Sequence, residues 1–159
     1  MHKKIIKKIK ERNLIIGVIG LGYVGLPIVI KFSLAGFKVI GIDTDIEKVD
    51  LLNNGKSYLH HFKNKEIKLA QEKGFKATQS FEEINNIDFI ILCLPTPIKK
   101  NKAPDLSYIV STMKNISPYL KKGQSISLES TSYPGTTEEE VLPYLEKKKF
   151  KIGNDFFLI

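Results

Sequence analysis

Cysteine and tryptophan are the residues that this sequence has least of. Cys93 is the only cysteine among 159 residues, and tryptophan does not occur. A single thiol allows neither a disulfide within the chain nor a cysteine-rich metal site, and it is compatible with a reducing compartment. Hydrophobic residues make up 42% of the chain, which is enough for one domain with a sizeable core.

Arginine is also scarce, although the chain is basic. The formal net charge is +8, yet Arg12 is the only arginine beside many lysines. Recognition of base edges and phosphates relies on the planar fork of arginine, so the charge does not favour a nucleic-acid partner. The lysines cluster at residues 3–10 and 147–151, in segments typical of solvated helix faces.

Long apolar runs are missing as well. Residues 89–94 form one of the longest, far short of the roughly 20 residues of a membrane-spanning helix, and no signal-peptide pattern opens the chain. We therefore expect a cytoplasmic protein that has no membrane partner.

What the sequence does contain, from Leu14 onward, is an alternation of short apolar runs and helical segments. We expect strands at residues 14–19, 38–43, 89–94 and 125–129, and helices at residues 24–35, 46–53, 65–73 and 106–116. Pro27 in a first turn, Gly36 at a helix end and Asp105 as an N-cap support the helices. The alternation predicts the α/β class, with a Rossmann-like, doubly wound parallel sheet in three α/β/α layers.

The two ends of the chain are expected to differ from this pattern. Residues 1–13 predict a separate helix or arm with Ile5, Ile6 and Ile9 on one side, which favours a docking helix over a membrane-surface anchor. Residues 14–159 would form the single domain. The apolar run at residues 155–159 resembles a further buried strand, so we expect the domain to be truncated there.

Three glycines stand close together in VIGLGYVGLP, residues 18–27. Gly20, Gly22 and Gly25 form a G-x-G-x-x-G pattern between an expected strand and an expected helix, within a βαβ unit. Gly20 would allow a tight turn, Gly22 the approach of a pyrophosphate to the backbone, and Gly25 close packing of helix on strand. The alternative is a purely structural turn; the context favours a dinucleotide at the helix N-terminus.

Asp43 ends the second expected strand, 18 residues beyond Gly25. A carboxylate there would accept hydrogen bonds from the adenosine ribose and repel a 2′-phosphate, which favours NAD over NADP. The alternative role is to cap the next helix, for which Asp45 is better placed. Lys48 would neutralise the edge of the cofactor, or simply be solvated.

The sequence resembles the N-terminal domain of the nucleotide-sugar 6-dehydrogenases, the UDP-glucose/GDP-mannose dehydrogenase family. The resemblance rests on six ordered motifs: GLGYVGLP at 20–27, GIDTD at 41–45 with Lys48, LNNGKSY at 52–58, CLPTP at 93–97, PDLSY at 104–108 and ESTSYPGTTEE at 129–139. It implies NAD as cofactor and a set of NAD-contacting residues: Gly20, Gly22, Tyr23, Val24, Gly25, Asp43, Lys48, Thr96 and Thr131. Tyr23 and Val24 would offer N–H groups to the pyrophosphate, and the two threonines would line the nicotinamide side or merely form turns.

The resemblance also implies a reaction. The family oxidises the C6 alcohol of a nucleotide sugar to a carboxylate with two NAD, through a cysteine thioester, and the full enzyme is expected to be a homodimer or larger. The nucleophile lies downstream of the matched region, and Cys93, inside an apolar run, reads as a buried hydrophobe. We therefore expect no catalytic residue in this chain and no turnover by the chain alone.

Several alternatives stay open from the sequence. The motifs look more like the UDP-N-acetylglucosamine branch, which would serve surface polysaccharide biosynthesis, than the UDP-glucose branch. A non-catalytic nucleotide-sensing Rossmann module is the competing class, and β-hydroxyacid dehydrogenases share the expected fold. His60 and His61 invite a metal site, which we do not expect, because adjacent side chains point in different directions.

Overall fold

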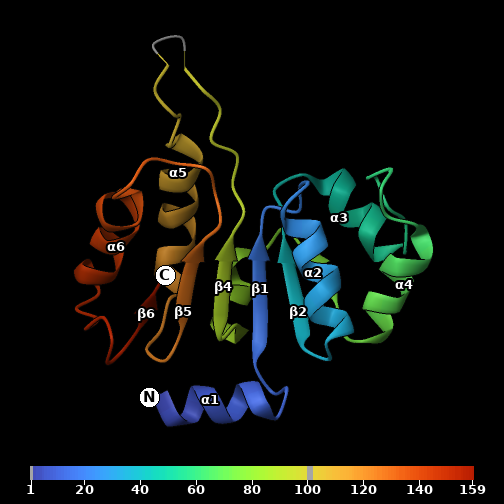
Figure 1. The fold of residues 1–159 in the computed structure, drawn as a ribbon, viewed down its shortest axis with the longest axis horizontal. Coiled ribbons are helices and arrows are strands. Elements are labelled where there is room, and N and C mark those ends of the chain that lie inside the picture. Colours follow the sequence, from blue (N-terminus) through green and yellow to red (C-terminus); the bar gives the residue numbers. More distant parts are fainter. Residues whose placement is uncertain (1, 100–101) are drawn as a thin grey trace.

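A computed structural model of the chain describes residues 2–99 and 102–159. Its centre is a six-stranded parallel sheet in the order β3-β2-β1-β4-β5-β6 (Figure 1). The strands are β1 (Ile15–Ile19), β2 (Lys38–Ile42), β3 (Lys76–Thr78), β4 (Phe89–Leu92), β5 (Ser125–Leu128) and β6 (Phe157–Leu158). The doubly wound parallel sheet that the sequence predicts is thereby confirmed.

Helices connect the strands. The α-helices are α1 (His2–Lys10), α2 (Gly25–Leu34), α3 (Ile46–Asn53), α4 (Asn64–Glu72), α5 (Ser107–Ile116) and α6 (Leu142–Lys147). Short 3-10 helices span Phe81–Asn86 and Ser117–Tyr119, and a π-helical turn, Thr137–Val141, leads into α6. Among the described residues, no helix is long and apolar enough to cross a membrane.

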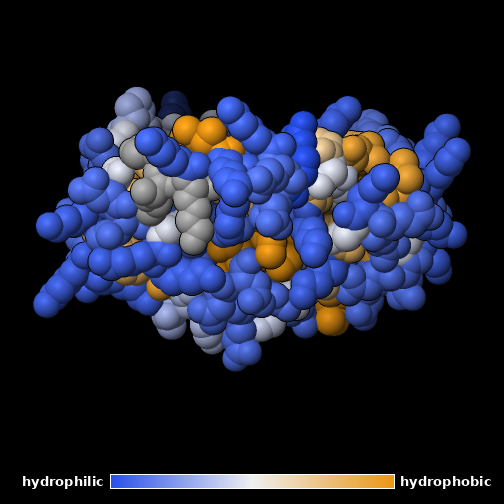
Figure 2. Space-filling view, turned by 90° about the horizontal axis from the view of Figure 1, so that it is seen from below, coloured by the Kyte–Doolittle hydropathy of each residue, from blue (hydrophilic) through white to orange (hydrophobic). Residues whose placement is uncertain are grey.

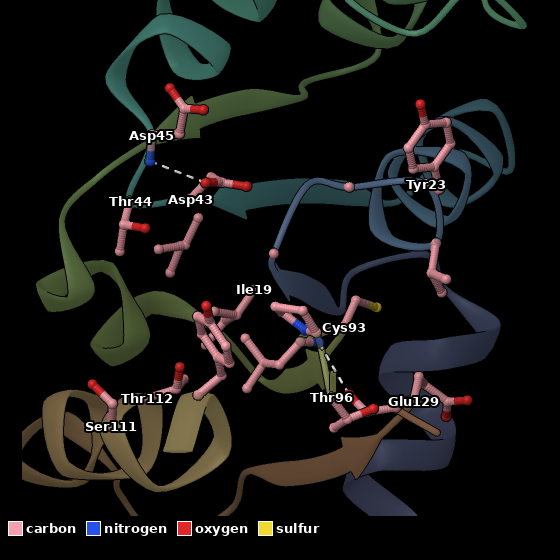
Figure 3. A pocket seen from close by; sticks show the side chains of 18 of the residues that line it. Ile19, Tyr23, Asp43, Thr44, Asp45, Cys93, Thr96, Ser111, Thr112 and Glu129 are labelled. Atoms are coloured by element: carbon pink, nitrogen blue, oxygen red, sulfur yellow. Dashed lines mark hydrogen bonds between the residues drawn. The ribbon is translucent and has the colours of Figure 1, made fainter. Parts of the chain in front are cut away.

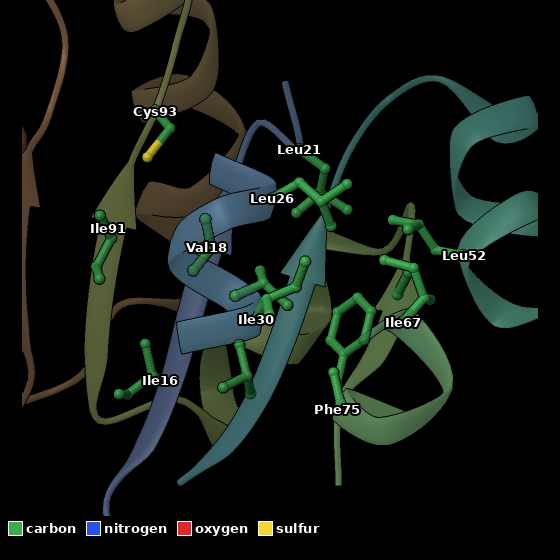
Figure 4. Packing of buried hydrophobic residues seen from close by; sticks show 14 of the residues in the cluster. Ile16, Val18, Leu21, Leu26, Ile30, Leu52, Ile67, Phe75, Ile91 and Cys93 are labelled. Atoms are coloured by element: carbon green, nitrogen blue, oxygen red, sulfur yellow. The ribbon is translucent and has the colours of Figure 1, made fainter. Parts of the chain in front are cut away.

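Two hydrophobic clusters, one on each face of the sheet, make the three layers. Successive residues of one strand belong to different clusters: Val18 packs toward α2 and Ile19 toward α5, because strand side chains alternate between faces. Figure 4 shows the first cluster, where Leu26 and Ile30 of α2 meet Val18. Burial on both faces explains why the strand sequences are almost continuously apolar.

Two helices, α3 and α5, have an aspartate near their first residue. Asp45 caps α3, since its Oδ1 accepts hydrogen bonds from the N–H groups of Glu47 (3.0 Å) and Lys48 (3.4 Å). Asp105 acts one residue earlier than expected: α5 begins at Ser107, and the Asp105 carboxylate accepts from its N–H at 3.1 Å. The N-cap residue of α5 is Leu106, which provides no side-chain cap, so the prediction of Asp105 as the N-cap is wrong by one position.

Three elements differ from the sequence prediction. β3 and α6 were not expected, because β3 is only three residues long and α6 only six. The expected buried strand at residues 155–159 is the short edge strand β6. Its residues Phe157 and Leu158 are only partly buried, whereas Phe156 before them is completely buried.

Helix α1 lies below the sheet, at the ends of the strands where they begin (Figure 1). Lys8 Nζ is 2.6 Å from Asp88 Oδ1, and the other carboxylate oxygen of Asp88 accepts from the Ile15 N–H at 3.0 Å. The expected apolar side of the helix is only partly confirmed, since Ile5 packs on the core while Ile6 and Ile9 are exposed. Figure 2, seen from below, shows a mostly hydrophilic face with small hydrophobic patches.

Candidate functional site

A cleft of about 790 Å³ opens at the carboxyl ends of β1, β2, β4 and β5. The chain runs from β1 outward to β2 and β3, then returns to place β4 on the other side of β1. In open α/β sheets the crevice at such a reversal of strand order is where ligands bind. Of the nine residues predicted to contact NAD, all but Gly25 line this cleft.

At each of the three motif glycines, the absence of a side chain has a different geometric consequence. Gly20 has φ +89°, and a Cβ built there would lie 2.3 Å from the Cys93 carbonyl oxygen. A Cβ on Gly25 would lie 1.9 Å from the Gly20 carbonyl oxygen, so loop and helix touch at this point. A Cβ on Gly22 would meet nothing within 4 Å, which leaves an open space at the cleft. The backbone at Gly22 is therefore free to be approached by a ligand.

The beginning of α2 carries backbone donors without acceptors. Gly22, Tyr23 and Val24 line the cleft, and their N–H groups donate to no residue within the described ranges 2–99 and 102–159. Val24, the N-cap residue, provides no side-chain cap. Successive unpaired N–H groups at a helix N-terminus, with the positive end of the helix dipole, form a site suited to an anion.

Asp43 lies at the end of β2 and is only 9% exposed. Its Oδ2 accepts from the Leu21 N–H at 2.8 Å, and its Oδ1 accepts from the Asp45 N–H at 3.0 Å (Figure 3). The carboxylate therefore holds the glycine loop as well as facing the cleft. Each oxygen keeps a further lone pair, which can accept a hydrogen bond from a ligand hydroxyl.

Lys48 approaches this end of the cleft from α3. Its Nζ is 3.5 Å from Asp45 Oδ2 and 3.8 Å from Asp43 Oδ2. Two carboxylates share this ammonium, so the local charge remains negative. Such an edge favours a ligand that donates hydrogen bonds over one that carries a phosphate.

The loops after β4 and β5 are joined by side chains. The Thr96 hydroxyl donates to the Thr131 carbonyl, and Ser130 Oγ accepts from the Leu94 N–H at 3.0 Å. The structure thus brings Thr96 and Thr131 together at the cleft, as the sequence predicts. The Thr96 hydroxyl also has the loop-forming role that was its alternative.

Cys93 is buried and makes no disulfide. Burial, with a smaller contribution from the charge of Glu129, raises the pKa of its thiol to about 11. The thiol is therefore protonated at neutral pH and is a poor nucleophile. Its sequence interpretation as a small buried hydrophobe is confirmed, because it packs in the cluster beneath α2 (Figure 4).

His60 and His61 are exposed in the loop between α3 and α4. Within the described residues, no group of three or more histidine, cysteine, aspartate or glutamate side chains is arranged to hold a metal ion. The two histidines do not line the cleft.

The wall opposite the glycine loop was not predicted. It comes from α5, whose residues Ser111, Thr112 and Asn115 line the cleft, and from Phe81. Figure 3 shows Ser111 and Thr112 across the cleft from Tyr23, whose side chain is 77% exposed. Small polar residues one turn apart on a helix carry no motif, so only the fold reveals them.

The chain is similar to a known protein family and to named enzymes. Residues 14–159 match the model of the UDP-glucose/GDP-mannose dehydrogenase family, NAD binding domain. A UDP-N-acetyl-D-glucosamine 6-dehydrogenase of Pseudomonas aeruginosa is 36% identical over 92% of this chain and 34% of its own length. A UDP-N-acetyl-D-mannosamine dehydrogenase of Salmonella typhimurium is 40% identical over 78% of this chain and 29% of its own.

A solved structure of a nucleotide-sugar dehydrogenase is also similar to this chain. A ternary complex of a GDP-mannose dehydrogenase from Pseudomonas aeruginosa superposes with a TM-score of 0.80 at 31% identity, covering 90% of this chain and 34% of that one. The chain spans about a third of the length of the relatives that it matches.

The glycine geometry predicts that substitution by alanine destabilises the fold at one position and has little effect at the other. Gly25→Ala should lower the free energy of unfolding by at least about 1 to 3 kcal/mol, because its Cβ meets the backbone of Gly20. Gly22→Ala should change it by less than about 0.5 kcal/mol, because the space there is open. Urea denaturation of both variants measures the difference, and equal losses would contradict the geometry.

Proposed function

The chain belongs to the UDP-glucose/GDP-mannose dehydrogenase family, and from this membership we propose that its cleft holds NAD for an enzyme that oxidises the C6 alcohol of a UDP-sugar to a carboxylate. The observation that supports this most is the row of unpaired N–H groups at Gly22, Tyr23 and Val24. Bound NAD would supply the hydride acceptor. The residues of this chain would bind and orient it.

The pyrophosphate of NAD fits the start of α2. The open space at Gly22 lets a phosphate reach the backbone, and the N–H groups of Tyr23 and Val24 follow it along the loop. Gly20 and Gly25 would contribute indirectly, because their lack of side chains lets loop and helix come close enough to form the site.

The adenosine ribose fits beside Asp43. Its hydroxyls would donate to the Asp43 carboxylate, whose lone pairs are only partly used by Leu21 and Asp45. A 2′-phosphate would meet two carboxylates balanced by the single ammonium of Lys48, so we assign NAD rather than NADP.

We assign the nicotinamide side to Thr96 and Thr131, at the carboxyl ends of β4 and β5. Cys93 is not the thioester-forming nucleophile in this proposal, because its raised pKa keeps the buried thiol protonated. We therefore place the nucleophile and the sugar-binding residues in a part of the enzyme outside these 159 residues.

For the sugar, we propose UDP-N-acetylglucosamine, in an enzyme of surface polysaccharide biosynthesis that acts as a homodimer or larger assembly. The motifs and two relatives support this sugar, whereas other relatives of similar identity are named UDP-N-acetyl-D-mannosamine dehydrogenases. Since the sugar would be held outside the cleft described here, the domain itself carries little information on the choice.

The 159-residue chain should bind NAD without turning over any UDP-sugar. Binding is expected because the glycine loop, Asp43 and the two threonines line one cleft. Turnover is not expected, because the residues that would position the sugar are proposed to lie elsewhere. Such positioning can lower the reaction barrier by roughly 7 to 11 kcal/mol. Calorimetric titration with NAD, followed by addition of UDP-sugars while NADH absorbance is recorded, tests both halves. If the folded chain does not bind NAD, the proposed function is refuted. If NADH forms continuously, the placement of the nucleophile outside this chain is refuted.

Replacing Asp43 should weaken the binding of NAD and reduce the preference of the chain for NAD over NADP. Asp43→Ala leaves ribose hydroxyls without an acceptor, which costs about 1 to 3 kcal/mol. Asp50→Ala is the matched control, since Asp50 is an exposed aspartate of α3 that does not line the cleft, and its loss should leave the NAD/NADP ratio unchanged. An unchanged ratio of NAD to NADP affinity in Asp43→Ala would rule out its role.

An intact enzyme that contains this domain should oxidise UDP-N-acetylglucosamine with a larger kcat/KM than UDP-glucose or UDP-N-acetylmannosamine. Initial rates of NADH formation with the three sugars, at saturating NAD, decide the order. A larger value for either competitor overturns the choice of sugar and leaves the NAD site untouched.

A further inference from the structure

Leu21, between the first two glycines of the motif, has both of its backbone polar groups held by side chains. Its N–H donates to Asp43 Oδ2 at 2.8 Å, and its carbonyl oxygen accepts a hydrogen bond from the Tyr58 hydroxyl. The residue itself is completely buried. The loop that ends β1 is therefore fixed by two other segments of the chain: the end of β2 and the loop between α3 and α4.

The Tyr58 hydrogen bond determines where the next N–H points. In a trans peptide the carbonyl and the following N–H lie in one plane and point in opposite directions, and the described residues contain no cis peptide. Holding the Leu21 carbonyl toward Tyr58 therefore directs the Gly22 N–H away from Tyr58. Gly22 lines the cleft and Tyr58 does not, so this N–H is held on the ligand side of the peptide.

Tyr58 is well suited to this task. Its ring is partly buried against the hydrophobic cluster under α2, so the hydroxyl has a defined position. Burial, followed by the charges of Asp43 and Asp45, raises its pKa well above the ordinary value for tyrosine. The hydroxyl therefore stays protonated and remains a donor throughout the physiological range.

We propose that Tyr58 is a positioning residue for NAD: by holding the Leu21 carbonyl, its hydroxyl aims the Gly22 N–H at the pyrophosphate. This inference rests on the proposed function of the cleft. It assigns to the third motif, LNNGKSY, a role in cofactor binding that requires no contact with the cofactor.

The variant Tyr58→Phe tests the proposal, because it removes the hydroxyl and keeps the ring that packs on the core. We expect roughly 3- to 10-fold weaker binding of NAD and ADP, the effect of losing one well-placed hydrogen bond. Adenosine, which has no phosphate, should bind with unchanged affinity. Calorimetry measures NAD and ADP, and NMR titration measures the weaker adenosine.

Tyr144→Phe is the matched control. The Tyr144 hydroxyl also donates to a backbone carbonyl, that of Val110 at 3.5 Å, but it joins α6 to α5 and does not line the cleft. Its loss should leave all three affinities unchanged. All titrations are made at a temperature where circular dichroism shows each variant fully folded.

The outcomes separate this inference from the proposed function. Failure of the wild-type chain to bind NAD removes the proposed function. Wild-type binding with equal NAD affinity in Tyr58→Phe overturns only the role of Tyr58. A matching loss for adenosine and NAD also overturns it, since Tyr58 would then support the shape of the whole cleft rather than the phosphate-facing N–H.

Discussion

The hydrogen bond from the Leu21 N–H to the Asp43 carboxylate is the contact on which the cleft depends. It joins the loop after β1 to the end of β2, the two segments between which a ligand must sit. A buried carboxylate needs such partners, because desolvation without hydrogen bonds would cost several kcal/mol. The hydrogen bond that satisfies the buried Asp43 side chain therefore also keeps the glycine loop in place.

Preorganisation of this kind leaves the binding groups unpaired in the free protein. The loop is packed tightly from below, where Gly25 touches Gly20, and pinned at Leu21 by two side chains. The donors at the start of α2 face the cleft with no protein acceptor among the described residues. An anion that arrives there finds the groups already oriented, so little conformational entropy has to be lost on binding.

Much of this could be predicted from the sequence because the decisive signals are local. The glycine spacing, the aspartate at the end of the second apolar run and the threonines after later runs all follow one another along the chain. The role of Tyr58 could not be predicted, because its hydroxyl donates to a carbonyl that lies 37 residues away in the sequence. Strand β3 was not predicted for a different reason. It has only one buried residue, Ala77, so it shows no apolar pattern, and it is defined as a strand by its pairing with β2.

The two ends of the cleft are built with different rigidity. At the Asp43 end, the loop is anchored by side chains from two other segments, Asp43 and Tyr58. At the other end, Thr96 and Thr131 lie on loops joined by the Thr96 hydroxyl and by Ser130, and Thr131 is exposed. The Thr96 hydrogen bond is exposed, and a hydrogen bond that is open to water contributes little net free energy. The Asp43 end of the cleft is therefore held by a buried hydrogen bond, whereas the loops at the threonine end are joined by a partly buried one and an exposed one.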